Sequence, residues 1–330
     1  METGGRCGGN GRADAFSGAA GAGGPAAGGR RPRGGRPVLA VALALVAALG
    51  YGSSDFTAGL ASRGADVLRV ALLAQAASAV IVLAAVAAVL PWPHAPAPSA
   101  GALVWGAASG LGEAAGALAL YAGFQRAPFS VAGPLSAVAA AGFSVLAGVL
   151  LGERPVPLAL AGIGFALPAI AAVSYSAAPA GTRSHGAARS WAGVGWGLAA
   201  GAGFALLFIA LSQAGARSGL WPVAVSEAAA AAVLAALAAA RRAFQLPTAG
   251  SRRLALITGV TGAGGAILYF LSVHKGLLAV TAVITSLYPV VTIVLARALL
   301  GERLTRARLG GLVLAAAAVS LIAAGGTSGG

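Results

Sequence analysis

The sequence is dominated by apolar runs of about 20 residues that are separated by short polar breaks. A helix of roughly 20 apolar residues is long enough to cross the hydrocarbon core of a bilayer. The runs lack the apolar–polar alternation of a barrel strand, which favours helices over a β-barrel. Only 9% of the residues are charged and 58% are hydrophobic, whereas soluble domains carry roughly 25% charged residues. The sequence therefore predicts an all-α, multi-pass membrane protein.

Turn residues divide the chain from Pro37 onward into about ten predicted transmembrane helices. These spans lie approximately at 38–60, 67–90, 101–123, 130–151, 157–175, 191–213, 219–240, 254–274, 280–300 and 307–324. Residues 1–36 are rich in Gly, Ala and Arg, with no apolar run to pack. We expect them to form a disordered tail.

The net charge of +14 is carried almost wholly by arginines in the tail and between the apolar runs. Arginines at such positions anchor helix ends and set topology, so we do not expect nucleic-acid binding. The single cysteine, Cys7, lies in the tail, and His94, His185 and His274 are widely separated. The sequence therefore predicts no disulfide, no metal site and no cofactor.

The pentapeptide Leu-Leu-Gly-Glu-Arg occurs twice, with its glycine at Gly152 and at Gly301. The same shift of 149 residues aligns Gly116 with Gly265, and no gap is needed over three consecutive spans. We infer a duplicated unit of about five helices. An odd number of spans inserts the second copy upside down. Inverted repeats are typical of secondary transporters, whose substrate site lies at the repeat interface near the membrane midplane.

The sequence around the pentapeptide also resembles a known family. Leu-Gly-Glu-Arg followed by a glycine, after a span with a proline in its middle (Pro134; Tyr288-Pro289), is similar to the end of an EamA repeat of the drug/metabolite transporter superfamily. The Gly/Ser-rich stretch 50–56 is similar to that family's first helix. The resemblance implies a two-repeat, ten-helix carrier with cytoplasmic termini, often an exporter and often proton-coupled. The distribution of arginines between the loops opposes that orientation. The predicted domains are the tail 1–36, the first repeat 37–176, a loop 177–190, the second repeat 191–324 and a short tail 325–330.

Three acidic residues lie inside apolar runs: Glu113, Glu227 and Asp55. A carboxylate at the bilayer centre costs roughly 2.5–3.5 kcal/mol, and such groups usually face an interior cavity. The repeat equivalents of Glu113 and Glu227 are Gly262 and Ser78, so neither acid is needed for the shared scaffold. We interpret these acids as proton carriers or substrate ligands. A neutral, hydrogen-bonded structural carboxyl is the alternative for each, and Asp55 also suits a gating or helix-terminal role.

Other polar residues in the spans have weaker claims. Tyr288 precedes Pro289, whose missing backbone donor frees a carbonyl that can line a pathway. Gln75 is a further candidate lining residue. Lys275 and Arg297 are interpreted as a helix-end charge and a side chain that extends to the interface. Aromatic residues could stack on a substrate or form an interfacial belt; they include Trp105, Tyr121, Trp196, Trp221 and Tyr269.

The repeated Glu153-Arg154 and Glu302-Arg303 are expected to be structural. Each pair follows a span directly, where a carboxylate and a guanidinium can pair and cap helix ends at the membrane face. Because the pairs recur in both copies, they are assigned to the scaffold and not to a substrate site.

The leading hypothesis is a secondary transporter that exports a small metabolite, amino acid or drug across the cytoplasmic membrane by alternating access. Protonation of Glu113, with Glu227 or Asp55, would alternate with substrate occupancy. A membrane channel or a non-transporting receptor is the alternative. An enzyme is disfavoured because no histidine or cysteine lies beside the acids in the sequence. The expected partners are a small-molecule substrate, the lipid bilayer and protons, with the chain as a monomer or homodimer.

Overall fold

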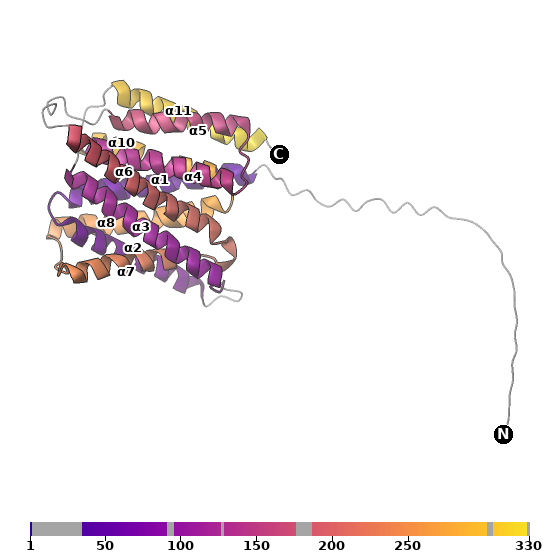
Figure 1. Cartoon of the computed structure of the whole chain (residues 1–330), viewed down its shortest axis with the longest axis horizontal. Coiled ribbons are helices and arrows are strands. Elements are labelled where there is room, and N and C mark those ends of the chain that lie inside the picture. Colours follow the sequence, from indigo (N-terminus) through magenta and orange to yellow (C-terminus); the bar gives the residue numbers. More distant parts are fainter. Residues whose placement is uncertain (2–34, 91–95, 127–128, 176–186, 302–305, 329–330) are drawn as a thin grey trace. The chain divides into compact units, whose positions relative to one another are not determined.

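The computed structural model describes residues 1, 35–90, 96–126, 129–175, 187–301 and 306–328. Every regular element in these ranges is a helix (Figure 1). The helices are α1 (Gly35–Ala61), α2 (Val67–Val89), α3 (Ala100–Arg126), α4 (Phe129–Leu150), α5 (Pro157–Tyr175), α6 (Ala187–Gln213), η1 (Ala216–Ser218), α7 (Trp221–Ala240), α8 (Ala249–Val273), α9 (Leu278–Thr285), α10 (Tyr288–Leu300) and α11 (Arg306–Ser328). Residues 34–330 form one compact unit. The tail predicted to be disordered lies almost wholly outside the described residues.

Seven segments of the described chain are long and apolar enough to cross a membrane. They are Val38–Ala61, Val67–Val89, Ala100–Gly123, Gly195–Gln213, Trp221–Ala240, Ala249–Val273 and Leu278–Leu300. Three shorter apolar helices occupy the positions of the other expected spans: Leu135–Leu150, Pro157–Ile170 and Leu309–Ile322. The chain is therefore a multi-pass membrane protein. Exposed large apolar side chains agree with a lipid environment, because water would not solvate them; they include Val104, Leu111, Val260, Leu309 and Val313.

The ninth expected span is interrupted in its middle. It consists of α9 and α10, and the break falls at Ser286 and Leu287, directly before Tyr288. Pro289 stands in the first turn of α10, where its missing N–H costs nothing, whereas in mid-helix its ring would clash with the preceding turn. The helix therefore ends and restarts at this proline.

The helices pack in pairs that correspond under the shift of 149 residues. α1 packs on α8, and its repeat equivalent α6 packs on α3. α6 also packs on α4, as α1 packs on α9 and α10. Two further contacts join a helix to its own equivalent, namely α2 with α7 and α5 with α11, which run side by side in Figure 1. The two halves of the chain thus meet along matching surfaces.

Glycines allow the closest of these contacts. A Cβ atom built on Gly203 of α6 would lie 2.5 Å from the backbone nitrogen of Gly116 on α3. In the corresponding contact of α1 with α8, a Cβ on Gly50 would lie 2.9 Å from the Cα of Gly265. Gly116 and Gly265 are repeat equivalents, so both copies use the same glycine for close helix approach.

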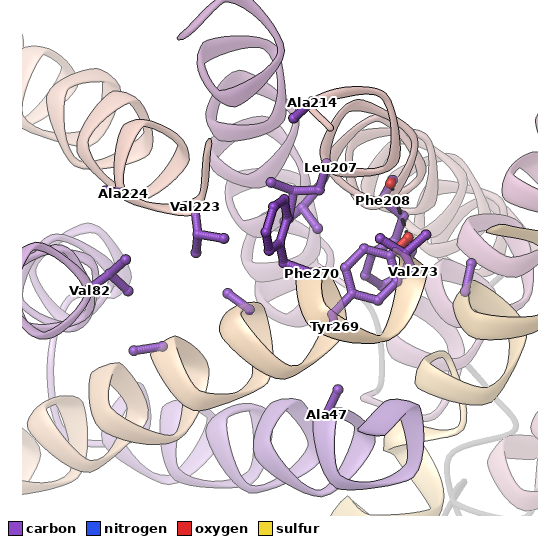
Figure 2. Packing of buried hydrophobic residues seen from close by; sticks show 14 of the residues in the cluster. Ala47, Val82, Leu207, Phe208, Ala214, Val223, Ala224, Tyr269, Phe270 and Val273 are labelled. Carbon is purple, nitrogen blue, oxygen red and sulfur yellow. Dashed lines mark hydrogen bonds between the residues drawn. The ribbon is translucent and has the colours of Figure 1, made fainter. Parts of the chain in front are cut away.

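The largest buried apolar cluster among the described residues joins helices from both halves. Figure 2 shows Phe208 of α6 beside Tyr269 of α8, with ring centroids 4.5 Å apart. The Tyr269 hydroxyl donates to the Phe208 carbonyl oxygen at 3.0 Å, which satisfies a polar group in an apolar surrounding. Ala47 of α1 and Val82 of α2 extend the cluster into the first half. This packing holds α6 and α8 in fixed positions.

Both copies of the pentapeptide end a helix at a glycine in the left-handed region. The φ angle is +91° at Gly152 and +68° at Gly301, which explains why glycine recurs there. Glu153 then reaches across to the other half: its Oε1 and Oε2 accept the backbone N–H groups of Leu278 (2.5 Å) and Ala279 (2.8 Å) at the start of α9. This contact differs from the expected pairing with Arg154, whose side chain is exposed. Its physical reason is that the N-terminal N–H groups of α9 have no partner within their own helix. Glu302 and Arg303 lie outside the described residues.

Candidate functional site

A cavity of about 100 Å³ lies among α1, α2, α3, α6, α7, α8 and α10. It is lined by residues from both halves of the chain. Its polar lining consists of Ser54, Asp55, Gln75, Ser78, Glu113 and Thr258. Its aromatic lining consists of Tyr51, Tyr121, Phe204, Phe208 and Tyr288. No lysine, arginine or histidine lines it among the described residues.

The cavity brings together the five residues that the sequence singled out as proton or substrate ligands. Asp55, Gln75, Glu113 and Tyr288 line it directly. Glu227 lies behind Gln75, and its carboxylate accepts the Gln75 side-chain amide at 2.5 Å (Nε2 to Oε2). These side chains come from five different helices, so only the packing of the halves makes them neighbours.

Gln75 lies between the carboxyl groups of Glu113 and Glu227, and we call these two acids the acid pair. The side chains of Gln75 and Ser226 both lie close to the Glu113 carboxyl group. Glu227 is only 1% exposed. The Gln75 amide nitrogen carries two donors, so one side chain from α2 serves carboxyl groups from α3 and α7. Two charged carboxylates so close in a low-dielectric interior repel each other strongly. The arrangement therefore favours a proton or a cation at this point.

Asp55 lines the cavity from α1, which packs against α8. The Ser54 hydroxyl donates to the Thr258 carbonyl oxygen at 3.2 Å. The Thr57 and Thr258 hydroxyls are 2.8 Å apart. These bonds fix the rotation of α1, and with it the direction of the Asp55 side chain toward the cavity.

The repeat equivalents of the acids also meet at this cavity. Gly262, the equivalent of Glu113, lines it from α8. Phe204, the equivalent of Asp55, lines it from α6. Ser78, the equivalent of Glu227, lines it from α2. Equivalent positions of both halves thus surround one space, as expected for a site at a repeat interface.

Tyr288 lies at the start of α10, where the interrupted span restarts. Its hydroxyl is 3.2 Å from the hydroxyl of Ser136 on α4. Beside it, the buried hydroxyl groups of Thr285 and Ser286 have no hydrogen-bond partner among the described residues. The freed backbone and these hydroxyls make the break a polar point next to the cavity.

The sequence reading missed several aromatic and hydroxyl residues of the lining. Tyr51 lies one helical turn before Asp55, and Tyr121 lies two turns after Glu113. The sequence left Tyr121 open between a substrate contact and the interfacial belt, and the structure places it at the cavity. Helical spacing from the buried acids would have found both residues. Lys275 and Arg297 are exposed and do not belong to the lining.

No group of three or more His, Cys, Asp or Glu side chains in the described part of the chain is arranged to hold a metal ion.

Comparisons with known proteins agree with the resemblance that the sequence suggested. Residues 191–324 match the family described as the EamA-like transporter family. No curated protein matches the chain. A solved structure titled "Crystal structure of protein" has 20% sequence identity and a TM-score of 0.67, over 86% of this chain and 95% of that one. At that identity the likeness extends to the fold alone.

Proposed function

We propose that this chain, whose residues 191–324 belong to the EamA-like transporter family, is a secondary transporter of a small molecule. Transport proceeds by alternating access, with the cavity as the substrate site. The observation that carries the proposal is the cavity between the two halves, with acids at or beside it from two helices of the first half and one of the second. Such a buried acid is costly unless it has a function or a partner.

The proposed architecture is a pair of inverted five-helix repeats, at residues 37–176 and 191–324. The matching helix contacts support it, because α1 with α8 and α3 with α6 are equivalent pairs. The three shorter apolar helices complete the ten proposed spans. In this arrangement the repeats rock against each other about the cavity. The proposed location is the cytoplasmic membrane.

The acid pair supplies the proposed coupling. When the cavity is empty, a proton on Glu113 or Glu227 removes the repulsion between the two carboxylates. When substrate enters, it takes over that role and the proton leaves. Because Gln75 lies between the two carboxyl groups, the protonation of one affects the protonation of the other. A proton gradient then drives substrate outward, in the direction that the family resemblance implies.

The test uses the full-length protein in liposomes with an imposed pH gradient. A panel of radiolabelled amines, amino acids and carboxylates is screened for accumulation. We expect at least one compound to accumulate above protein-free liposomes, and Glu113→Gln to lower its initial rate at least tenfold. Asp66→Asn is the matched control, an acid-to-amide change outside the cavity. The Asp66 side chain caps α2 by accepting hydrogen bonds from the backbone N–H groups of Leu68 and Arg69, and asparagine caps a helix equally well.

Three results would contradict the proposal. If no compound accumulates, the proposed transport activity is wrong. If Glu113→Gln leaves the initial rate unchanged for every accepted compound, Glu113 has no part in the mechanism. A flux that does not saturate and does not respond to the pH gradient indicates a channel.

A further inference from the structure

The geometry points to a compact organic cation as the ligand of the cavity, one that combines a positive charge with an apolar body. The inference rests on the proposed function only in treating this ligand as the transported substrate. The positive charge of the ligand follows from the chemistry of the cavity.

The charge of the lining sets the sign of the ligand. Asp55 and Glu113 line the cavity, and Glu227 adjoins it through Gln75. No basic side chain lines it among the described residues. A carboxylate or phosphate on the ligand would meet acids without a compensating cation, and burying an unpaired charge is costly. A cation instead relieves the repulsion between the carboxylates.

An unused acceptor inside the cavity points to a ligand independently of the acids. The buried hydroxyl of Tyr51 has no hydrogen-bond partner among the described residues. Tyr51 lines the cavity. Buried polar groups normally have a partner, so this oxygen is available to a bound molecule.

The apolar and aromatic part of the lining favours an organic cation. Leu120, Leu207 and Leu234 present aliphatic carbon to the cavity. Tyr51 and Phe208 meet edge to face, with ring centroids 6.3 Å apart. Aromatic faces attract alkylammonium groups, whereas no group of three or more His, Cys, Asp or Glu side chains among the described residues is arranged to hold a bare metal ion.

The size of the cavity limits the ligand. Its volume is about 100 Å³, which is smaller than the roughly 150 Å³ cavity that accepts benzene in an engineered protein. A branched ammonium ion with a few carbon atoms suits this space.

The test compares three small probes in which three or four methyl groups surround one central atom: tetramethylammonium, neutral tert-butanol and anionic pivalate. Their equilibrium binding to the full-length protein in lipid nanodiscs is measured by titration calorimetry. We expect tetramethylammonium to bind at least tenfold more tightly than either of the others. Its affinity should increase as the pH is raised, because protons compete for the same carboxylates, whereas that of tert-butanol should not change.

Variants identify the site of binding. Glu113→Gln should weaken tetramethylammonium binding at least tenfold, and Glu113→Asp, which keeps the charge, should weaken it less. Equal thermal unfolding of the variants and the native protein checks that they are folded. Asp66→Asn, outside the cavity, should bind as the native protein does.

Outcomes for the ligand and for transport are distinguishable. Equal or tighter binding of pivalate or tert-butanol, no detectable binding of tetramethylammonium, or binding unaffected by Glu113→Gln overturns the inference. If tetramethylammonium binds as expected while liposomes accumulate no compound, the inference stands and the proposed transport fails. If only an anion or a neutral compound is transported, the transporter stands and the cation inference fails.

Discussion

Replacing Glu153 with alanine removes both acceptors that cap α9 from the other half of the chain. The two bonds join Glu153 to the N–H groups of Leu278 and Ala279, at 2.5 and 2.8 Å. Leu278 is 2% exposed and Ala279 is fully buried, so water does not replace the lost carboxylate. A hydrogen bond to a charged group contributes about 1.5–3 kcal/mol. Two bonds at the lower value give a loss of about 3 kcal/mol in unfolding free energy.

The assay is thermal unfolding of the purified protein in lipid nanodiscs, followed by intrinsic tryptophan fluorescence. At about 2–4 °C per kcal/mol for a large domain, the expected decrease in Tm is roughly 6 °C or more. Glu153→Gln keeps one acceptor oxygen and should lose about half as much. Gly148→Ala is an independent perturbation, because a Cβ at Gly148 would lie 2.5 Å from Glu153 Oε2 and displace the carboxylate.

Arg154→Ala is the control for this prediction. Its side chain is exposed, and exposed ion pairs contribute little, so its Tm should stay within about 1 °C of the native value. An equal decrease for Glu153→Ala and Arg154→Ala would refute the capping argument and restore the pairing expected from the sequence. No decrease for Glu153→Ala would refute it as well.

Three further predictions concern packing, topology and the cavity. Gly116→Leu should lower Tm, because a Cβ there would lie 2.8 Å from the Phe204 ring on α6 and overpacking costs about 1–3 kcal/mol; Gly101→Ala, with open space around it, should have no effect. Single cysteines at Arg154 and Arg303, in a background without the native cysteine, should react with an impermeant maleimide from opposite sides of the membrane; labelling from the same side would contradict inverted repeats. Tyr288→Phe removes one hydrogen bond, worth about 0.5–1.5 kcal/mol, and should change the transport rate less than Glu113→Gln does; an equal loss would assign the Tyr288 hydroxyl a direct part in transport.

Features that depend on residues near one another in the chain could be read from the sequence. The length of the apolar runs predicted membrane-spanning helices, and the structure confirms a multi-pass helical protein. The family resemblance is confirmed for residues 191–324. The glycine of the repeated pentapeptide marked the ends of α4 and α10, because only a residue without a Cβ adopts positive φ at no cost. The count of ten spans and the inverted arrangement remain part of the proposal.

Features that depend on the rotation of helices about their axes were decided by the tertiary structure alone. A helix that is apolar on every side gives no amphipathic period from which its inner face can be read. The sequence therefore placed Gln75 and Glu227 inside spans, but not against each other across 152 positions. It likewise placed Glu153 at a turn, but it did not show that the Glu153 side chain accepts hydrogen bonds from the first turn of α9, 125 positions away. The sequence shows where a buried charge lies along its own helix. Its partner depends on how the two halves pack, and the sequence does not show this, because the faces toward lipid and toward protein are equally apolar.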